Sequence, residues 1–245
     1  MRMPPRLKTR LDTRIPFRMR ATAEAVSRYF RRNEGTTDYA SIPEVVLSGD
    51  FDIEFDLLTD TQQQSTCLAL YTSDTSEYMY IQVLSSGKIK ISTSGFTPGN
   101  GLISVNNGVI NKIKVVLSGS QFSVFVNGLI DYSVNHTNPS KMGKTYSVLI
   151  NAAKQSLSSS NFDYLAGIIA NLKIYDAGTL VRDYPLDEPK GTSVVYDNVA
   201  GNNGTIINGN DEDKGLFTKQ ANGDWKGSVL DVPPWDSVDQ ILVKS

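Results

Sequence analysis

The chain has 245 residues, of which 40% are hydrophobic and 20% are charged, as in an ordinary globular protein. No apolar run approaches the roughly 20 residues that a membrane-spanning helix needs. With one cysteine, Cys67, and one histidine, His136, the sequence excludes an intrachain disulfide framework and most zinc sites.

The net charge of −2 conceals a division between two parts of the chain. Residues 1–32 carry ten Arg or Lys and two acidic residues, whereas residues 33–245 carry 14 basic and 24 acidic residues. Net charges of +8 and −10 are typical of a basic arm attached to an acidic globular body. We therefore expect an anchoring arm over residues 1–35, a folded domain over 36–220 and a C-terminal extension over 221–245.

The arm reads MRMPPRLKTRLDTRIPFRMRATAEAVSRYFRR, and Pro4, Pro5 and Pro16 prevent a continuous helix over its first half. Apolar residues on one side of residues 21–32 predict a short helix there. The arm is thus expected to be extended with a short helical part. No apolar segment follows its positive charges, so it does not resemble a secretory signal.

Three functions would use such an arm: binding nucleic acid phosphates, targeting an organelle, or docking into an acidic groove of a partner protein. A solvated, disordered tail is the alternative to all three. We favour docking, because the arginines are spaced to reach carboxylates along an extended groove and the aromatic residues would supply buried anchors. The expected docking residues are Arg2, Arg6, Arg10, Arg14, Phe17, Arg18, Arg20, Tyr29 and Phe30.

After the arm, short β-branched and aromatic runs recur with turn residues between them, and no long amphipathic helix is predicted. Ser85–Lys88 and Asn127–Gly128 predict tight hairpin turns. This pattern indicates an all-β fold, an antiparallel β-sandwich or jelly roll. The expected strands lie at residues 50–57, 66–71, 77–84, 89–93, 146–152 and 165–176, with three more between 111 and 134.

The first of these strands alternates strictly between acidic and apolar residues. Asp52, Glu54 and Asp56 occupy every second position. The apolar residues around them are Phe51, Ile53, Phe55 and Leu57. Because successive side chains of a strand point to opposite faces, the three acids share one face. They form either a solvated sheet face or the acid–base machinery of a glycosidase.

Three segments carry a family resemblance: FDIEFDL at 51–57, INKIKVVLSGSQFSVFVNGLIDYSV at 110–134 and FDYLAGIIANLKIYDAGTL at 162–180. They resemble the concanavalin A-like lectin/glucanase superfamily in its laminin-G-like branch, over roughly residues 36–186. The resemblance implies two stacked, curved antiparallel sheets in a concanavalin A-like jelly roll. It also implies a carbohydrate-binding or adhesive role.

The closing segment, LVRDYPLDEPKGTSVVYDNVAGNNGTIING at 180–209, is similar to the tail of lectin-like domains from bacteriophage virion proteins. This likeness implies a non-enzymatic structural or adhesive virion component, such as a capsid decoration, present in many copies or as a homo-oligomer. Residues 1–32 would tether it to other virion proteins. The protein would be made in the host cytoplasm, and neither nucleic acid nor membrane is an expected partner. The alternative is a tail-fibre module that binds or cleaves host-surface glycans.

Glucanases of the superfamily carry a strand motif Glu-x-Asp-x-x-Glu, whose two Glu act as nucleophile and general acid. Glu54 and Asp56 match its first two positions, but Thr59 occupies the third. Asp60 follows one residue later, which in a strand means the face opposite to that of position 59. Retaining hydrolysis needs two carboxyl groups about 5–5.5 Å apart. We therefore expect no catalytic residue, no enzymatic activity and a solvated acidic face.

The residues at 54–56, EFD, are also similar to the metal-binding strand of legume-type lectins. The next residues add only Asp60, and His136 lies in a remote loop. We therefore expect no metal site and no cofactor. A Ca²⁺ site stays open as an alternative, because the loop NGNDEDKG at 208–215 is rich in oxygen ligands.

Two aromatic pairs stand out as candidate contact residues. Tyr78 and Tyr80 share one face of their strand, where they would form either a glycan platform or ordinary packing. Trp225 and Trp235 lie in the tail and suit an interface or in-domain packing equally. Cys67, in the middle of a strand, is expected to be a small core residue.

Overall fold

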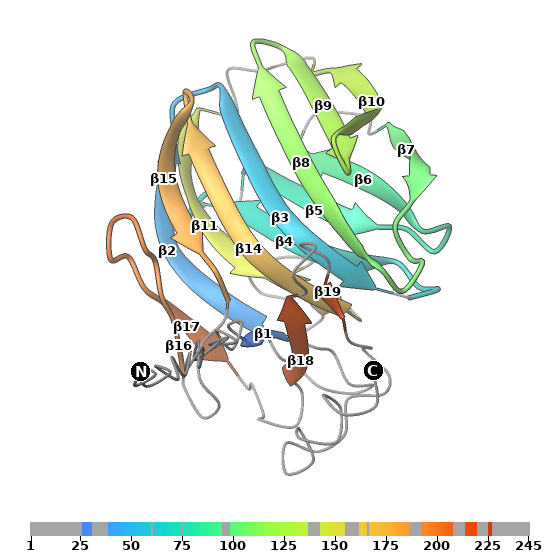
Figure 1. Ribbon diagram of the computed structural model, residues 1–245. Helices are drawn as coiled ribbons and strands as arrows, with labels where there is room; N and C mark the ends of the chain where they lie inside the picture. The colour runs from blue at the N-terminus through green and yellow to red at the C-terminus, as the bar shows by residue number, and fades with distance from the viewer. Residues whose placement is uncertain are drawn as a thin grey trace, which may run out of the picture.

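The computed structural model shows a protein in which every regular element of the described residues is a β-strand, and two antiparallel sheets stack face to face (Figure 1). This confirms the expected all-β sandwich. Among the described residues, no helix is long and apolar enough to cross a membrane. The described residues are 26–30, 39–59, 61–74, 76–94, 99–136, 143–154, 162–165, 167–186, 193–207, 214–219 and 225–226.

One sheet contains six strands among the described residues, and β3 lies inside it between β8 and β14. Both pairings of β3 are antiparallel and run along almost its whole length. The order across the sheet is β10 (Leu129–Asn135), β9 (Gln121–Val126), β8 (Ile110–Ser118), β3 (Phe51–Thr59), β14 (Gly167–Asp176) and β15 (Thr179–Tyr184).

The second sheet has eight strands within the same described residues and lies behind the first in Figure 1. Its order is β16 (Val194–Val195), β17 (Gly204–Ile207), β2 (Tyr39–Leu47), β11 (Lys144–Ile150), β4 (Ser65–Tyr71), β5 (Tyr78–Val83), β6 (Lys88–Thr93) and β7 (Asn100–Ser104). Two small sheets accompany it: β12 (Ala152–Lys154) with β13 (Phe162–Tyr164), and β1 (Val26–Phe30) with β18 (Lys214–Lys219) and β19 (Trp225–Lys226).

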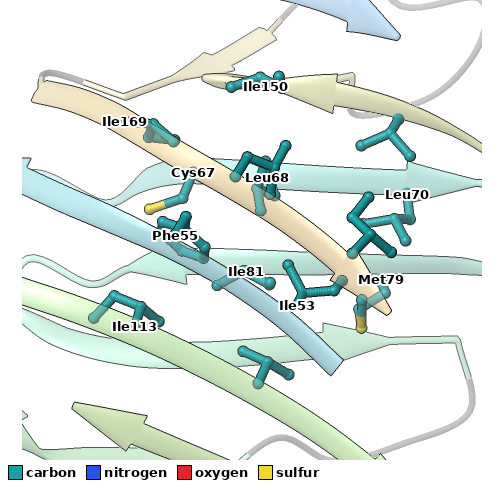
Figure 2. Packing of buried hydrophobic residues seen from close by; sticks show 14 of the residues in the cluster. Ile53, Phe55, Cys67, Leu68, Leu70, Met79, Ile81, Ile113, Ile150 and Ile169 are labelled. Atoms are coloured by element: carbon teal, nitrogen blue, oxygen red, sulfur yellow. The ribbon is translucent and has the colours of Figure 1, made fainter. Parts of the chain in front are cut away.

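The hydrophobic core lies between the two main sheets. Ile53 and Phe55 of β3 face Leu68 of β4 and Ile81 of β5 across it (Figure 2). These four side chains are at most 2% exposed, whereas the acids that alternate with them on β3 are only half-buried. The predicted inside and outside faces of this strand are therefore confirmed.

Cys67 belongs to the same core, beside Phe55 and Ile169 in Figure 2. It is fully buried, and this burial raises the pKa of its thiol far above the ordinary range. A neutral, inaccessible thiol is a poor nucleophile. The expectation of a core residue is confirmed.

Tight turns connect the strands where the sequence places glycine. Asn127 and Gly128 join β9 to β10 with φ values of 53° and 80°, the backbone of the predicted hairpin turn. Gly87, with φ of 76°, confirms the turn before β6. A further turn of this kind joins β14 to β15 through Ala177 and Gly178. Sequence reasoning missed it because alanine rarely takes a positive φ.

The short helix expected over residues 21–32 is wrong for the part that the structure describes. Val26–Phe30 instead form β1, which pairs antiparallel with β18. A helix this short has little stability alone, whereas β-branched and aromatic residues suit a strand once a partner strand is present. That partner lies far away in the sequence, as the pair Val26 and Thr218, 192 residues apart, shows. Residues 1–25 lie outside the described residues.

A buried aspartate ties the two sheets together at one side of the sandwich. Asp131, which is 2% exposed, lies at a bulge in β10, and one of its carboxylate oxygens accepts the N–H groups of Leu102 and Ile103 on β7, both at 2.6 Å. A Cβ on Gly101 would lie 2.0 Å from the other oxygen. Glycine at 101 is therefore what lets the carboxylate approach the strand.

A second buried aspartate covers the edge of β15. Asp197 accepts the N–H of Asp183 on that strand at 3.0 Å and the N–H of Val199 in its own loop at 3.1 Å. Tyr184 donates its hydroxyl to the carbonyl of Asn202 at 2.6 Å, which fixes the far end of the same loop. The loop thus lies against an edge that would otherwise present unpaired backbone groups.

The two faces of β3 should respond differently to mutation. Phe55→Asp should lower the free energy of unfolding by about 4 kcal/mol or more, because it forces a charge into the core. Glu54→Gln should change it by less than about 1 kcal/mol, because it removes one arm of a partly exposed ion pair. Chemical denaturation measures both. A larger loss for Glu54→Gln than for Phe55→Asp would contradict the register of this strand.

Candidate functional site

The outer face of the six-stranded sheet is hollowed into an open groove with a volume of about 910 Å³. The strands that carry it, β3, β8, β9 and β14, lie side by side at the front of Figure 1. Its polar lining residues are Asp52, Glu54, Asp56, Lys112, Lys114, Ser123, Asn171 and Lys173, and its partly exposed apolar residues include Val116 and Phe125.

The strand register sets these side chains in rows across the groove. Glu54 lies opposite Lys114 on β8 and opposite Lys173 on β14. Lys114 in turn lies opposite Phe125 on β9, and Phe125 opposite Ile130 on β10. Directly opposed residues on one face of a sheet are near enough to interact. From β14 to β9, one row of side chains therefore consists of a cation, an anion, a second cation and an aromatic ring.

One lysine holds two of the three acids. Lys114 Nζ lies 2.8 Å from Asp52 Oδ2 and 2.8 Å from Glu54 Oε1. Partial burial lowers the pKa of Lys114, but its hydrogen bonds to Asp52 and Glu54 and the charges of these carboxylates outweigh this effect, so the pKa is raised overall. The ammonium group stays charged and fixes the orientation of both carboxylates.

The third acid is held by an asparagine in an unusual backbone conformation. Asn171 lies at a bulge in β14, with φ of 51°, and its Nδ2 donates to Asp56 Oδ2 at 2.6 Å. Its own N–H donates to the carbonyl of Pro185 at 3.1 Å. Bulges often redirect a side chain beside a functional site, and asparagine tolerates the left-handed region better than most residues. Sequence reasoning missed Asn171, although a lone asparagine inside a strand signals a bulge.

The other side of the groove is less polar. Phe125 and Val116 are partly exposed there, and Ile130 is 61% exposed. Ser123 and Ser133, on neighbouring strands, share a hydroxyl hydrogen bond of 2.9 Å. The charged residues of the groove thus come from β3, β8 and β14. Its partly exposed apolar residues are Val116 of β8 and Phe125 of β9, and Ile130 of β10 lies opposite Phe125, next to the groove lining.

The position that would complete a glucanase motif does not contribute to the groove. Thr59 is fully buried, and its hydroxyl accepts the N–H of Thr61 at 3.1 Å. Asp60 lies outside the described residues. Glu54 and Asp56 are therefore brought together in the groove without an acid at the third position of the motif. This arrangement suits hydrogen bonding to a ligand that carries many hydroxyl groups.

Tyr78 and Tyr80 lie on the outer face of the other sheet, away from the groove, because they alternate with core residues of β5. Their rings stack at 4.7 Å with an interplanar angle of 23°, and Tyr71 packs edge-on to Tyr80 at 5.7 Å. Ala69, Leu149, Ala153 and Tyr39 also belong to this cluster. A glycan platform at these tyrosines stays a prediction.

Of the expected docking residues of the arm, only Tyr29 and Phe30 are among the described residues. Tyr29 and Phe30 lie on β1, and Trp225 lies on β19. Docking itself stays a prediction. The remaining residues named for the arm and the tail lie outside the described residues: Arg2, Arg6, Arg10, Arg14, Phe17, Arg18, Arg20 and Trp235.

A metal site finds no support in the described part of the chain, where no three His, Cys, Asp or Glu side chains gather as ligands. His136 is buried, with its Nε2 3.2 Å from the hydroxyl of Thr93 and its ring tilted against Phe122. The loop proposed for Ca²⁺ lies mostly outside the described residues, so that alternative stays a prediction.

Comparison with known proteins extends these observations. In fold, the chain is similar to a candidate carbohydrate-binding protein from Bacteroides ovatus, with a TM-score of 0.56 and 14% identity over 80% of this chain and 60% of that one. It is also similar to domains LG4–5 of the mouse laminin α1 chain, with a TM-score of 0.50 and 11% identity over 70% of this chain and 46% of that one. For the LG1–3 region of the laminin α2 chain the TM-score is 0.50, with 15% identity over 76% of this chain and 35% of that one.

This chain therefore spans less than two thirds of each of these three structures, and the low identities show a shared fold alone. No curated protein matches its sequence. The family model of the concanavalin A-like lectin/glucanases superfamily matches residues 34–180, which is more than half of the chain and includes the strands that form the groove floor. With its paired curved sheets and this match, the chain belongs to the concanavalin A-like lectin/glucanases superfamily.

Proposed function

We propose that the protein is a non-enzymatic, adhesive module that binds a glycan in the groove of its six-stranded sheet. The observation that carries this proposal is the row of Lys173, Glu54, Lys114 and Phe125 across four adjacent strands. Sugar hydroxyls both donate and accept hydrogen bonds, so they suit a surface where ammonium groups and carboxylates alternate. An aromatic ring at the end of the row suits the C–H face of a sugar ring.

The groove is also organised before any ligand arrives. Lys114 fixes Asp52 and Glu54, and Asn171 fixes Asp56, all on strands that pair on both sides. Binding therefore orders few additional side chains, which lowers its entropic cost. Protein ligand sites are commonly preformed hollows with a few placed polar groups.

The proposed lack of hydrolysis is supported by the same residues. A glycosidase of the retaining type needs a nucleophile and a separate general acid. Thr59, at the third motif position, has no carboxyl group and is fully buried. The acids that do line the groove are held by Lys114 and Asn171, an arrangement that favours accepting hydrogen bonds over proton transfer.

Binding should depend on the groove acids. On a glycan array, and then by calorimetry with the best-bound glycan, Asp56→Asn and Glu54→Gln should each weaken binding by about tenfold or more, because each removes a charged hydrogen-bond acceptor. Glu44→Gln is the matched control, since Glu44 is exposed on β2 of the other sheet. Equal affinities for all four proteins would show that the ligand binds elsewhere.

Hydrolysis should be absent. Incubation of the purified protein with laminarin, agarose and other β-glucans should release no reducing sugar above the buffer blank. Glu54→Gln serves as the comparison, because a true glucanase would lose its activity in that variant. Release of reducing sugar by the unaltered protein, abolished in Glu54→Gln, would overturn the non-enzymatic proposal.

A second part of the proposal concerns how the module is attached to other proteins. We propose that its basic arm tethers it, in many copies, to a larger assembly, in the manner of a virion decoration or tail-fibre component. The support is the charge of +8 in residues 1–32, which cannot form a core of their own, against −10 in the rest of the chain. A tether at one end leaves the groove free to meet a glycan-bearing surface.

Deletion of residues 1–25 tests this tether, since it keeps β1 and its pairing with β18. The truncated protein should stay folded by thermal unfolding but should no longer co-purify with the particle that carries the full chain. Replacing the arginines of the arm by lysine should weaken incorporation partly, because lysine lacks the planar fork that binds carboxylates. Normal incorporation of the truncated protein would exclude docking. A free arm peptide that binds duplex DNA with a steep salt dependence would favour nucleic acid instead.

A further inference from the structure

The charges that line the groove balance one another. Among the described lining residues there are three acids and three lysines, and each acid has a lysine or an amide donor beside it. Lys173 lies opposite Glu54, and Lys112 opposite Asp56. A strongly anionic ligand would meet three carboxylates, and a cationic one would meet three ammonium groups. The groove therefore favours a ligand without net charge.

The apolar side of the groove sets a second condition. Phe125 of β9 and Ile130 of β10 lie opposite one another and form an apolar strip, and Val116 of β8 is a diagonal neighbour of Phe125, opposite Ser123. Ile130 is 61% exposed, although strand residues on the same face are mostly polar. Covering this strip with apolar groups of a ligand is favourable in proportion to the area removed from water. The C–H face of a plain sugar can cover Phe125, but a ligand without a further apolar substituent would leave Ile130 uncovered.

One ligand can satisfy both conditions at once. Its hydroxyl groups would lie over Lys173, Glu54 and Lys114, while an apolar substituent would lie over Phe125 and Ile130 one or two strands away. We infer that the groove takes an uncharged glycan whose sugars bear methyl groups, as N-acetylated and 6-deoxy sugars do. This inference rests on the proposed function and names the class of glycan.

The test uses neutral oligosaccharides in matched pairs, which have the same backbone and differ only by an N-acetyl or 6-deoxy group. The methyl-bearing member should bind about fourfold tighter for each methyl group that the strip buries. The difference should persist at high salt, because neither member carries a charge. Calorimetry or surface plasmon resonance gives the ratio of the two dissociation constants for each pair.

Variants test which residues of the groove bind the sugar and which give the preference for methyl groups. Ile130→Ser should bring the ratio close to one while retaining binding of the plain sugar. Phe125→Ala should also lower the ratio toward one, but it should weaken both members of a pair, because Phe125 belongs to the binding row. Lys173→Ala should weaken both members of a pair equally and leave the ratio unchanged. Leu102→Ser is the control, because Leu102 is 76% exposed on β7 and does not line the groove.

The outcomes separate this inference from the function on which it rests. Equal affinity within the pairs, or preference for an acidic glycan, would overturn the inference and leave glycan binding in place. A preference for methyl-bearing sugars that Phe125→Ala does not remove would also overturn it. Failure to bind any glycan of a broad array would overturn the proposed function itself.

Discussion

The two-residue period of β3 is the constraint on which both the core and the groove depend. Phe51, Ile53, Phe55 and Leu57 fill the space between the sheets, while Asp52, Glu54 and Asp56 form the floor of the groove on the other face. Because the strand pairs on both sides, a slip of one residue would bury three acids and expose four large apolar side chains. Burial on one face thereby fixes the position of every charge on the other.

The charged residues on the groove face orient one another more than they stabilise the fold. Partly exposed ion pairs contribute little to the free energy of unfolding, and the pair formed by Lys114 is of that kind. Their geometry, however, holds two carboxylates in one orientation, and Asn171 does the same for Asp56. The superfamily's name covers lectins and glucanases on one framework, so function depends on the residues of the site and not on the fold. The proposed lack of hydrolysis rests on Thr59, which has no carboxyl group and is turned into the interior.

The parts that sequence reasoning predicted are those set by local patterns. The alternation in β3, the turn at Asn127–Gly128 and the core position of Cys67 each follow from a few neighbouring residues. The parts it missed depend on contacts between distant segments: the pairing of β1 with β18, the contact of Asp131 with β7 and the bulge that directs Asn171 toward Asp56. The acids of the groove were visible in the sequence as one face of a strand. Their lysine partners were not, because register between strands is decided by the whole sheet.

The buried carboxylates of Asp131 and Asp197 affect whether neighbouring copies of the domain can pair through the margins of their sheets. Strands at the margin of a sheet offer free N–H groups, and these are the groups through which β-proteins fuse into ribbons and fibres. Here Asp131 occupies two of them on β7, and Asp197 with its loop occupies another on β15. Side-chain oxygens therefore hold the places that a strand from a neighbouring copy would take. At these positions of β7 and β15 a second copy of the chain therefore cannot add a strand through backbone hydrogen bonds.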